Sequence, residues 1–348
     1  MKISHIYWFA YFNMFSPSVR YRAKYPLDHL NKKYGISSTL LFPGYSPYNI
    51  FHFIKAYVSC LFFRKKDSLI VIQRVHTNFI YSSALRILLA FQKKNTLYDL
   101  DDAEYFDYPH GSIDQFISNC ESCSVGSNAV KEYAEKINEQ VFLLTSPVMQ
   151  HNMTKEMRNT ILTIGWIGDF AGSHRESMFS IFFPSITDLG FKVKLVILGV
   201  REKLFIKEIF DYFATNENIF IEIPTHLNWQ DEMSVYSKVK EFDVGICPLI
   251  DNEITRAKSA FKIKQYFSCG VPALGSRVGE NARFIEDKKN GFICNTPDEY
   301  RNAILRIKEM TNEEYESLSK NAKSSVHKFD MEHYCSTILN FYTNRDSN

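Results

Sequence analysis

The stretch from residue 243 to residue 295 reads DVGICPLIDNEITRAKSAFKIKQYFSCGVPALGSRVGENARFIEDKKNGFICN. It contains three short apolar runs, DVGICPL, VPALGS and GFICN, and a segment of helical character that opens near Lys258 and stops at Gly270. Short apolar runs that alternate with helical segments indicate βαβ units and a parallel sheet. This stretch therefore predicts an α/β fold for the region around it.

The same alternation continues through the rest of the chain. Further strands are predicted at KISHIYWF, ISSTLLF, SLIVIQR, TLYDLDD, CSVGS and QVFLL, and then at ILTIGWIG, KVKLVILG and IFIEI. The polar stretch TSPVMQHNMTKEMRNT separates the two series and predicts a linker. Because 348 residues suffice for two domains, we predict two parallel-sheet domains with a ligand site outside the carboxyl ends of their strands.

The composition is that of a folded protein. Hydrophobic residues make up 45% of the chain and charged residues 23%, which argues against intrinsic disorder. No run approaches the roughly 18 apolar residues of a transmembrane helix, and the apolar N-terminus is interpreted as a first strand. Seven irregularly spaced cysteines are typical of reduced thiols, so we expect a cytoplasmic protein.

The net charge of +2 is unevenly distributed. Residues 1–98 contain 14 Lys and Arg against only Asp28 and Asp67, which gives 14 − 2 = +12 and leaves 2 − 12 = −10 for the remaining chain. A basic segment of this kind indicates an anionic partner, either a membrane surface or a nucleic acid. The alternative is that the basic residues form a solvent-exposed face that binds no partner.

The segment that opens near Lys258 and Ser259 is a candidate anion site. The first N–H groups of a helix and its dipole favour a negative charge, and Lys258 and Lys262 would add to that preference. Gln265, almost one helical turn after Lys262, would face the same direction and could bind a hydroxylated ring. Alternatively, the two lysines form the solvated side of an amphipathic helix.

The pattern Lys-Ser-x-x-Lys-x-x-Gln-Tyr-x-x-x-Gly-x-Pro, followed by Ser-x-Val-Gly-x-Asn, resembles the donor-binding half of retaining GT-B glycosyltransferases of the family-4 type, the glycosyl transferases group 1. The family's Glu-x7-Glu motif is replaced here by Ala257 and Gln265. Lys258, Lys262 and Gln265 are similar to a Lys-x3-Lys-x2-Glu branch with Gln at the last position. The resemblance implies that the amides at the helix start hold a diphosphate and that Gln265 binds the ribose, without charge assistance.

The resemblance also implies the domain layout of the GT-B fold, in which two Rossmann-like parallel-sheet domains face each other across a cleft. Residues 1–155 would form an N-terminal Rossmann-like acceptor-side domain and residues 156–327 a C-terminal Rossmann-like nucleotide-sugar domain. Residues 328–348 would form a helix that packs back toward the N-terminal domain. In ILTIGWIGDFAGSHR, Gly168 would let the backbone approach the donor, and Arg175 falls where the family has a basic residue on the diphosphate. The alternative for Arg175 is a surface arginine.

The first domain resembles the family more loosely. In SPSVRYRAKYPLDHL, Arg20 and Arg22 stand where the family has glycines near the donor phosphates, so Arg20 is a candidate phosphate ligand or a plain surface residue. His76 either lines the cleft or is a core histidine. His226 and Trp229 follow IFIEI, where a base-binding loop would lie.

TLYDLDDAEYFD places Asp99, Asp101 and Asp102 at the end of a predicted strand. The family often has a catalytic-site His there, and Asp101 is the nearest match, with Asp102 beside it; a carboxylate could orient the acceptor hydroxyl or accept its proton. One alternative is that Asp101 or Asp102 caps a helix. Another is that Asp-x-Asp is the metal–diphosphate signature of GT-A enzymes.

The resemblance thus implies a retaining, hexosyltransferase-like enzyme that uses a nucleotide-diphosphate sugar, with no metal and no further cofactor. The enzyme would act in surface polysaccharide biosynthesis and would transfer the sugar to a glycan or to a lipid-linked acceptor. The second hypothesis is a non-catalytic GT-B subunit that binds a nucleotide sugar or acts as a scaffold, because both motif glutamates are absent. We expect no nucleic-acid partner, since the basic residues form no recognised motif.

Residues 50–63, IFHFIKAYVSCLFF, are apolar apart from a narrow polar stripe, and Arg64, Lys65 and Lys66 follow directly. A helix of this length rises about 21 Å, which is too short for the roughly 30 Å core of a bilayer. It is either a helix buried against the first sheet or part of a face that makes peripheral contact with an anionic membrane, on the inner face of the plasma membrane.

Overall fold

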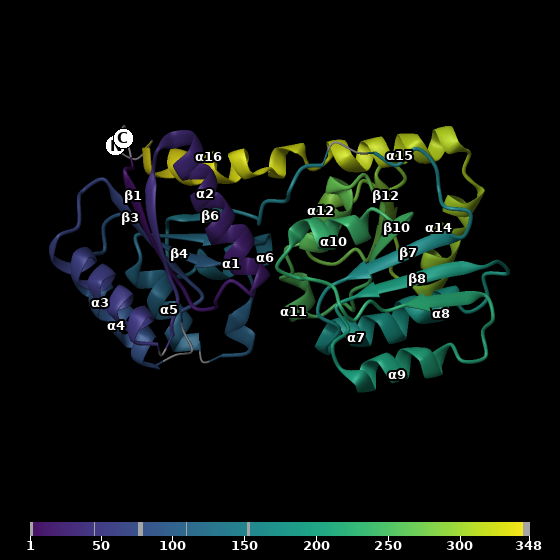
Figure 1. Cartoon of the computed structure of the whole chain (residues 1–348), viewed down its shortest axis with the longest axis horizontal. Coiled ribbons are helices and arrows are strands. Elements are labelled where there is room, and N and C mark those ends of the chain that lie inside the picture. The colour runs from purple at the N-terminus through teal and green to yellow at the C-terminus, as the bar shows by residue number, and fades with distance from the viewer. Residues whose placement is uncertain (1–2, 45, 76–78, 109, 152–153, 344–348) are drawn as a thin grey trace. The chain divides into compact units, whose positions relative to one another are not determined.

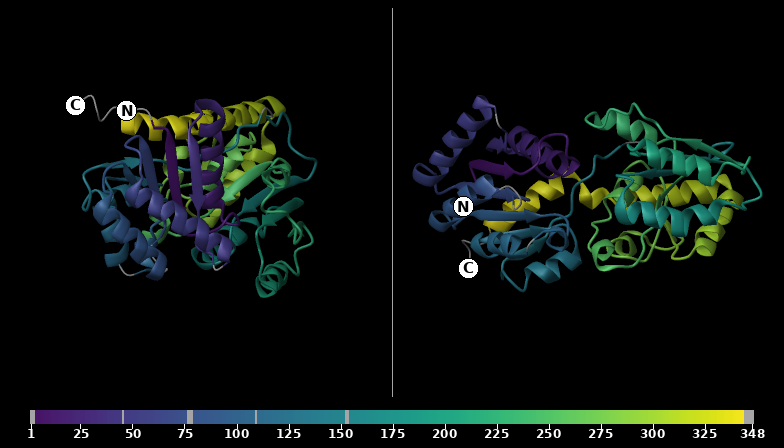
Figure 2. Two further views of the ribbon diagram at one scale, coloured as in Figure 1. Left: turned by 60° about the vertical axis from the view of Figure 1, so that its left-hand side comes forward. Right: turned by 90° about the horizontal axis from the view of Figure 1, so that it is seen from below.

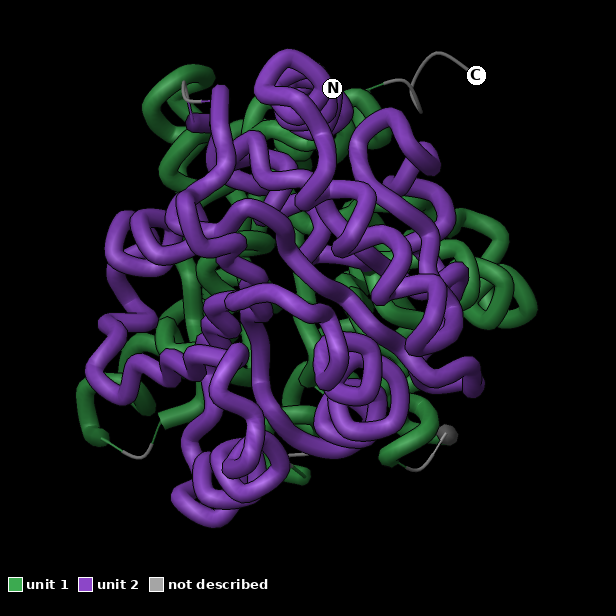
Figure 3. The backbone as a smooth tube through the Cα atoms, turned by 90° about the vertical axis from the view of Figure 1, so that its right-hand side faces the viewer, with its two compact units in different colours: residues 1–147, 257–259, 329–348 green, residues 148–256, 260–328 purple. Residues whose placement is uncertain are grey.

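The computed structural model describes residues 3–44, 46–75, 79–108, 110–151 and 154–343 (Figure 1). The chain forms two compact units (Figure 3): unit 1 comprises residues 1–147, 257–259 and 329–348, and unit 2 comprises residues 148–256 and 260–328. Each unit contains one parallel sheet of six strands with helices around it. The predicted α/β fold with two parallel-sheet domains is therefore confirmed.

The sheet of unit 1 has the order β2-β1-β3-β4-β5-β6, with parallel pairing throughout. Its strands are β1 (His5–Ala10), β2 (Ser37–Leu41), β3 (Ser68–Gln73), β4 (Thr96–Leu100), β5 (Ser122–Val125) and β6 (Val141–Leu143). Its helices are α1 (Pro17–Val19), η1 (Arg20–Lys24), α2 (Tyr25–Tyr34), α3 (Pro47–Phe62), α4 (Phe79–Phe91), η2 (Glu104–Phe106), α5 (His110–Asn119), α6 (Asn128–Ala134) and α16 (Met331–Thr343). Every residue of β3 is buried, as expected for a parallel strand covered on both faces.

The sheet of unit 2 has the order β12-β11-β10-β7-β8-β9 and is also parallel. Its strands are β7 (Leu162–Ile167), β8 (Val193–Leu198), β9 (Ile219–Glu222), β10 (Val244–Cys247), β11 (Ala273–Gly275) and β12 (Gly291–Ile293). Its helices are α7 (Gly172–Ser177), η3 (Met178–Phe182), α8 (Phe183–Ile186), α9 (Lys203–Tyr212), α10 (Glu232–Val239), α11 (Glu253–Arg256), α12 (Phe261–Ser268), α13 (Asn281–Phe284), α14 (Pro297–Glu309) and α15 (Asn312–Ser324), and η4 (His327–Phe329) crosses into unit 1. The strand order reverses between β7 and β10, the type of position where open α/β sheets bind ligands.

A buried ion pair joins the elements of unit 1. Arg22, with no exposed surface, donates from Nε and Nη2 to the two carboxylate oxygens of Asp99 at 2.9 and 2.5 Å, and from Nη1 to the Leu144 carbonyl at 2.8 Å. Ser124 donates to the same carboxylate at 2.6 Å. Burial alone would lower the pKa of the Arg22 guanidinium, but Asp99 raises it above its ordinary value. Arg22 therefore has a structural role, although the sequence places it in a segment that resembles a phosphate-contact loop.

Helix α16 brings the last described residues back to unit 1, where it packs against α2 (Figure 1). The Tyr334 hydroxyl donates to the Arg22 carbonyl at 3.1 Å, and the Tyr342 hydroxyl donates to the Thr96 carbonyl at 3.2 Å. At the surface, Glu332 accepts from His29 at 2.7 Å and pairs with Lys33 at 2.8 Å. Residues far apart in the chain thus complete one core.

The Arg22–Asp99 pair leads to a prediction about stability. Arg22→Met and Asp99→Asn should each lower the free energy of unfolding by about 3–5 kcal/mol, because each leaves a buried charge without its partner. Urea denaturation measures this loss. As a control, Lys24→Met removes an exposed pair with Asp28 and should cost no more than about 1 kcal/mol. Equal losses in Arg22→Met and Lys24→Met would contradict the role of the buried pair.

Candidate donor site and acidic cluster

Two glycines lie at the carboxyl ends of neighbouring strands in unit 2. Gly168 follows β7 with φ 156°, and Gly199 follows β8 with φ 107°. A Cβ atom on Gly199 would lie 1.8 Å from the carbonyl oxygen of Gly168, and a Cβ atom on Gly168 would lie 2.5 Å from Cε of Lys262. The two glycines therefore allow close packing at the strand ends, with the Lys262 side chain lying against Gly168.

Lys262 is held at this position by aromatic and imidazole groups. Its Nζ lies 2.9 Å from Nε2 of His174 and 5.6 Å from the centre of the Trp166 ring. A lysine ammonium can only donate, so Nε2 of His174 accepts this hydrogen bond. A positive charge thus lies beside a backbone that has no side chain to obstruct a ligand.

Helix α12 begins at Phe261, three residues after Lys258. The residue before it, Ala260, has a left-handed backbone with φ 51° and ψ 33°, which is unusual for a residue other than glycine. This turn corrects the predicted helix start near Lys258 and Ser259, which group with unit 1, whereas Lys262 lies in the first turn of α12. The start of α12, Lys262 and the loop at Gly168 together form a candidate anion-binding site.

Gln265 and Trp229 lie in the same unit. Gln265 is 6% exposed on helix α12, and its predicted contact with a ribose stays a prediction. A Cβ atom on Gly199 would lie 3.4 Å from the Trp229 ring, so the loop after β9 approaches Gly199. His226, in the same loop, is exposed, and His76 lies outside the described residues.

Arg175 is engaged by neighbouring side chains. Its Nε and Nη2 donate to Oε2 of Glu208 at 3.0 and 2.7 Å, and its guanidinium stacks on Phe179 and Phe205 at 5.0 and 5.2 Å from the ring centres. A phosphate contact by Arg175 would have to compete with Glu208. The role predicted for Arg175 stays a prediction.

Asp101, Asp102 and Glu104 follow β4 in unit 1 and form the acidic cluster. Oδ1 of Asp101 lies 3.7 Å from Nη1 of Arg74, and this oxygen is buried and accepts no hydrogen bond from the described residues. Arg74 itself has a left-handed backbone with φ 56° and also pairs with Glu104. Helix η2 begins after Ala103 without a side-chain cap, so the described residues give no support for capping by Asp101 or Asp102.

Asp102 and Arg20 have different neighbours. Both carboxylate oxygens of Asp102 lie 3.4 Å from Nζ of Lys258, so unit 1 brings together one residue predicted for the acceptor side and one predicted for the donor. Arg20 is 4% exposed and donates from Nη1 to the carbonyls of Met14 and Phe15 at 3.1 and 2.8 Å. Its contact with a phosphate stays a prediction. Ser259 is partly buried next to Lys258.

Three residues of these sites are not among the candidates from the sequence: His174, Gly199 and Arg74. The glycine that ends KVKLVILG is a detectable signal, because a glycine directly after a parallel strand often marks a close backbone approach. His174 and Arg74 carry no comparable local signal. Within the described residues, no group of His, Cys, Asp and Glu side chains is arranged to hold a metal ion.

Comparisons with solved structures show which proteins share the fold of this chain. Among solved structures, a glycosyltransferase from Rickettsia africae ESF-5 has a TM-score of 0.72 at 13% identity over 100% of both chains. Sucrose-phosphate synthase from Thermosynechococcus elongatus has a TM-score of 0.70 at 11% identity over 99% of both chains. Anabaena Alr3699/HepE in complex with UDP has a TM-score of 0.63 at 11% identity over 99% of this chain and 100% of that one.

These neighbours and the two parallel six-stranded sheets define the GT-B fold. Residues 161–309, which include the glycine pair and Lys262, match the family model described as Glycosyl transferases group 1. No curated protein matches the chain in sequence. The fold that the resemblance implied is confirmed, and two complete parallel sheets do not fit the GT-A alternative.

The two glycines lead to a second prediction. Gly199→Ala should lower the free energy of unfolding by about 1–3 kcal/mol or more, because the φ of Gly199 is positive and the new Cβ would clash with the carbonyl oxygen of Gly168. A Cβ atom on Gly168 would lie 2.5 Å from the flexible end of Lys262 and 3.0 Å from the Trp166 ring, but not against backbone, so Gly168→Ala should cost less stability than Gly199→Ala and should also weaken nucleotide binding. Urea denaturation and nucleotide titration measure the two effects. Gly111→Ala, with open space around it, is the control, and a Gly199→Ala variant as stable as wild type would contradict the packing argument.

Proposed function

We propose that the protein is a glycosyltransferase that moves a sugar from a nucleotide-diphosphate sugar to a glycan or lipid-linked acceptor. The observation that carries the proposal is the Lys262 ammonium, which lies against Gly168 in the first turn of α12, inside the segment that matches the family model. The HepE structures of the same fold were solved with UDP and with UDP-glucose, which supports a uridine-diphosphate sugar among the candidate donors.

The chemistry needs stabilisation of a departing nucleoside diphosphate. As the bond between the sugar and the diphosphate breaks, negative charge grows on the phosphate oxygens. Lys262 and the N–H groups at the start of α12 are donors fixed before the reaction, and such donors stabilise developing charge without reorganisation. We therefore propose a metal-independent reaction. Retention of configuration follows from the family resemblance and is part of the same proposal.

The acceptor hydroxyl must lose its proton when it attacks the sugar. Asp101 is the proposed residue, because its Oδ1 is buried and accepts no hydrogen bond from the described residues. A carboxylate in this condition can orient a hydroxyl or take its proton. Asp102 is already 3.4 Å from Lys258, so we assign it a supporting electrostatic role.

A non-catalytic GT-B subunit that binds nucleotide sugars is the second candidate function. The family's glutamate positions hold Ala257 and Gln265, and Arg175 pairs with Glu208. An enzyme weakened in this way would still bind a nucleotide. Product formation from a labelled sugar nucleotide distinguishes the two functions.

The proposed setting is surface polysaccharide synthesis on the cytoplasmic side of the plasma membrane. The support is the charge of +12 in residues 1–98, which favours an anionic surface. A lipid-linked acceptor would be presented at that surface.

Nucleotide binding tests the donor half of the proposal. UDP or GDP should raise the melting temperature, and Lys262→Ala should weaken the affinity by about 1.5–3 kcal/mol, the usual value of a hydrogen bond to a charged group. Lys207→Ala, which removes an exposed lysine on α9 of the same unit, should leave the affinity unchanged. If both variants bind the nucleotide as tightly as wild type, Lys262 does not belong to the site.

Sugar transfer tests the catalytic half. With labelled UDP-, GDP- and dTDP-sugars, we expect hydrolysis or transfer from at least one donor, and the activity should persist in EDTA. Asp101→Asn should lower turnover by about 10²–10⁴-fold with unchanged nucleotide affinity, whereas the nearby exposed Asp107→Asn should be normal. Activity that EDTA abolishes and manganese restores would overturn the metal-independent mechanism, and an equal loss of melting temperature in Asp101→Asn would indicate a structural role.

A further inference from the structure

Helices α3 and α4 of unit 1 lie side by side (Figure 1, Figure 2). Their inner faces belong to one hydrophobic core, which includes Ala56 and Cys60 of α3 and Leu85 and Leu88 of α4. Their outer faces are also apolar. Eleven of the 23 large exposed hydrophobic side chains among the described residues lie between residues 48 and 91: Tyr48, Ile50, Phe51, Ile54, Val58, Phe62, Phe63, Phe79, Ile80, Ile87 and Phe91.

The exposed residues follow the helical period. On α3, Phe51, Ile54, Val58 and Phe62 are spaced by three or four residues, and Ile80, Ile87 and Phe91 continue the pattern on α4. Phe62 is 70% exposed and Phe91 74%. A helix whose outer face is apolar as well as its inner face is normally covered on both faces. We call these eleven exposed residues the α3–α4 face. Exposed apolar side chains that gather on one surface mark an interaction site.

Basic residues gather at one end of this face. Arg64, Lys65 and Lys66 follow α3, and Lys93 and Lys94 follow α4. Since α3 leads into β3, α4 leads into β4, and these strands are parallel neighbours, the two basic segments meet at the same edge of the sheet. Residues 47–95 contain eight Lys and Arg against the single acid Asp67, and neither helix contains Asp or Glu.

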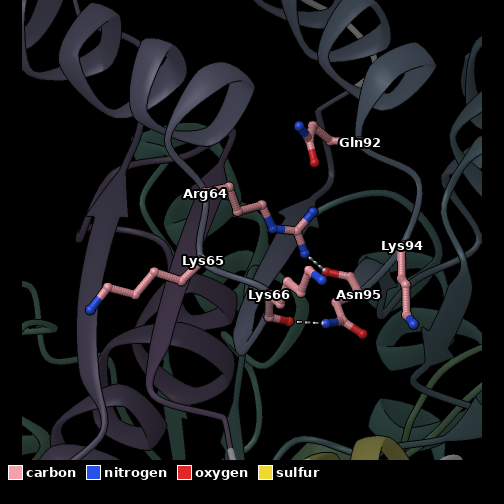
Figure 4. Close-up of a pocket in the computed structure, with 6 residues that line it drawn as sticks. All are labelled: Arg64, Lys65, Lys66, Gln92, Lys94 and Asn95. Carbon is pink, nitrogen blue, oxygen red and sulfur yellow. Dashed lines mark hydrogen bonds between the residues drawn. The ribbon is translucent and has the colours of Figure 1, made fainter.

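The two basic segments form a pocket of about 330 Å³ lined by Arg64, Lys65, Lys66, Gln92, Lys94 and Asn95 (Figure 4). Arg64 is its fixed part, because Nη2 donates to the carbonyls of Ser68 and Asn95 at 2.9 and 2.7 Å. Lys65 and Lys94 extend to either side of Arg64 in Figure 4. The carboxylate of Glu121 is also nearby, and it accepts from the Asn95 backbone N–H at 2.6 Å. The pocket is therefore framed by a held guanidinium and exposed lysines.

We infer that the α3–α4 face docks on an anionic lipid bilayer, with its apolar side chains among the acyl chains and a headgroup phosphate in the basic pocket. The basic residues beside the face favour a lipid surface over a protein partner. Lysine is depleted in the cores of protein–protein interfaces, whereas phenylalanine and aliphatic residues flanked by lysine and arginine are typical of helices that lie in the lipid interface. Within the described residues, no helix has the length and apolar composition needed to span a bilayer.

This inference rests on the proposed function only for the reason to be at a membrane, since a lipid-linked acceptor would be found there. Vesicle binding needs no sugar nucleotide. Failure to bind vesicles and failure to transfer a sugar are therefore separate results.

Flotation of the full chain with vesicles tests the inference. Vesicles of phosphatidylcholine with phosphatidylglycerol should bind at least about tenfold more protein than phosphatidylcholine alone, because the basic residues of the pocket are attracted to an anionic surface and their contributions add. Binding should fall in about 1 M salt, where the screening length is about 3 Å. Absence of binding at low salt, or equal binding to neutral and anionic vesicles, would overturn the inference.

Matched variants separate the two parts of the surface. The triple variant Lys65→Gln, Lys66→Gln and Lys94→Gln should lose at least about tenfold in affinity for anionic vesicles. The triple variant Lys203→Gln, Lys289→Gln and Lys320→Gln removes the same charge from exposed positions of unit 2 and should bind normally. Arg64 is not substituted, because it donates hydrogen bonds to the Ser68 and Asn95 carbonyls and its loss would also disturb the structure. Equal loss in both triple variants would show a general charge effect and would overturn the pocket.

The apolar part is tested by Ile54→Ser with Phe62→Ser, which should weaken vesicle binding at least about fivefold with an unchanged melting temperature, because exposed side chains lose the burial that they would gain in lipid. Leu204→Ser with Met233→Ser, at exposed positions of unit 2, is the control. Sedimentation completes the test: a dimer that persists in high salt and dissociates in the Ile54→Ser, Phe62→Ser variant would assign the face to a second copy of the chain and overturn the lipid proposal.

Discussion

The buried pair between Arg22 and Asp99 constrains unit 1 more than any surface contact does. A charge with no exposed surface is stable only when its partner is in place, so η1 and β4 must be assembled together. The same guanidinium binds the carbonyl of Leu144 after β6, and Tyr334 of α16 binds the Arg22 carbonyl. Because Asp99 lies two residues before the acidic cluster, this pair also fixes the backbone from which the candidate acceptor-side carboxylates project.

The strands could be predicted from the sequence because a parallel strand covered on both faces is a short, continuous apolar run, and SLIVIQ of β3 is buried at every residue. The same reasoning could not separate Arg20 from Arg22. Both lie in SPSVRYRAKYPLDHL, and the partner that buries Arg22 is 77 residues away. The start of α12 cannot be predicted from the sequence, because the left-handed backbone before it falls on Ala260, and alanine gives no signal for that conformation.

The candidate donor site shows a similar division. The sequence indicated Gly168 and Lys262 separately, one from a loop after a strand and the other from a helix, but not that Cε of Lys262 would occupy the space of the missing Gly168 side chain. It also pointed to Arg175 and passed over its neighbour His174, which contacts Lys262. Adjacent residues of a helix face different directions, so the packing of α7 places His174 against Lys262 and Arg175 against Glu208.

The return of helix α16 to unit 1 affects how the protein is made. The chain enters unit 2 after residue 147 and leaves it at residue 328, so unit 2 is synthesised completely before α16 emerges from the ribosome. At about 5–20 residues per second, the first 147 residues wait roughly 10–40 s for the helix that covers them. Throughout that interval the Arg22 and Thr96 carbonyls lack the hydrogen bonds that Tyr334 and Tyr342 later donate, and the unit synthesised second is the first that can complete its fold.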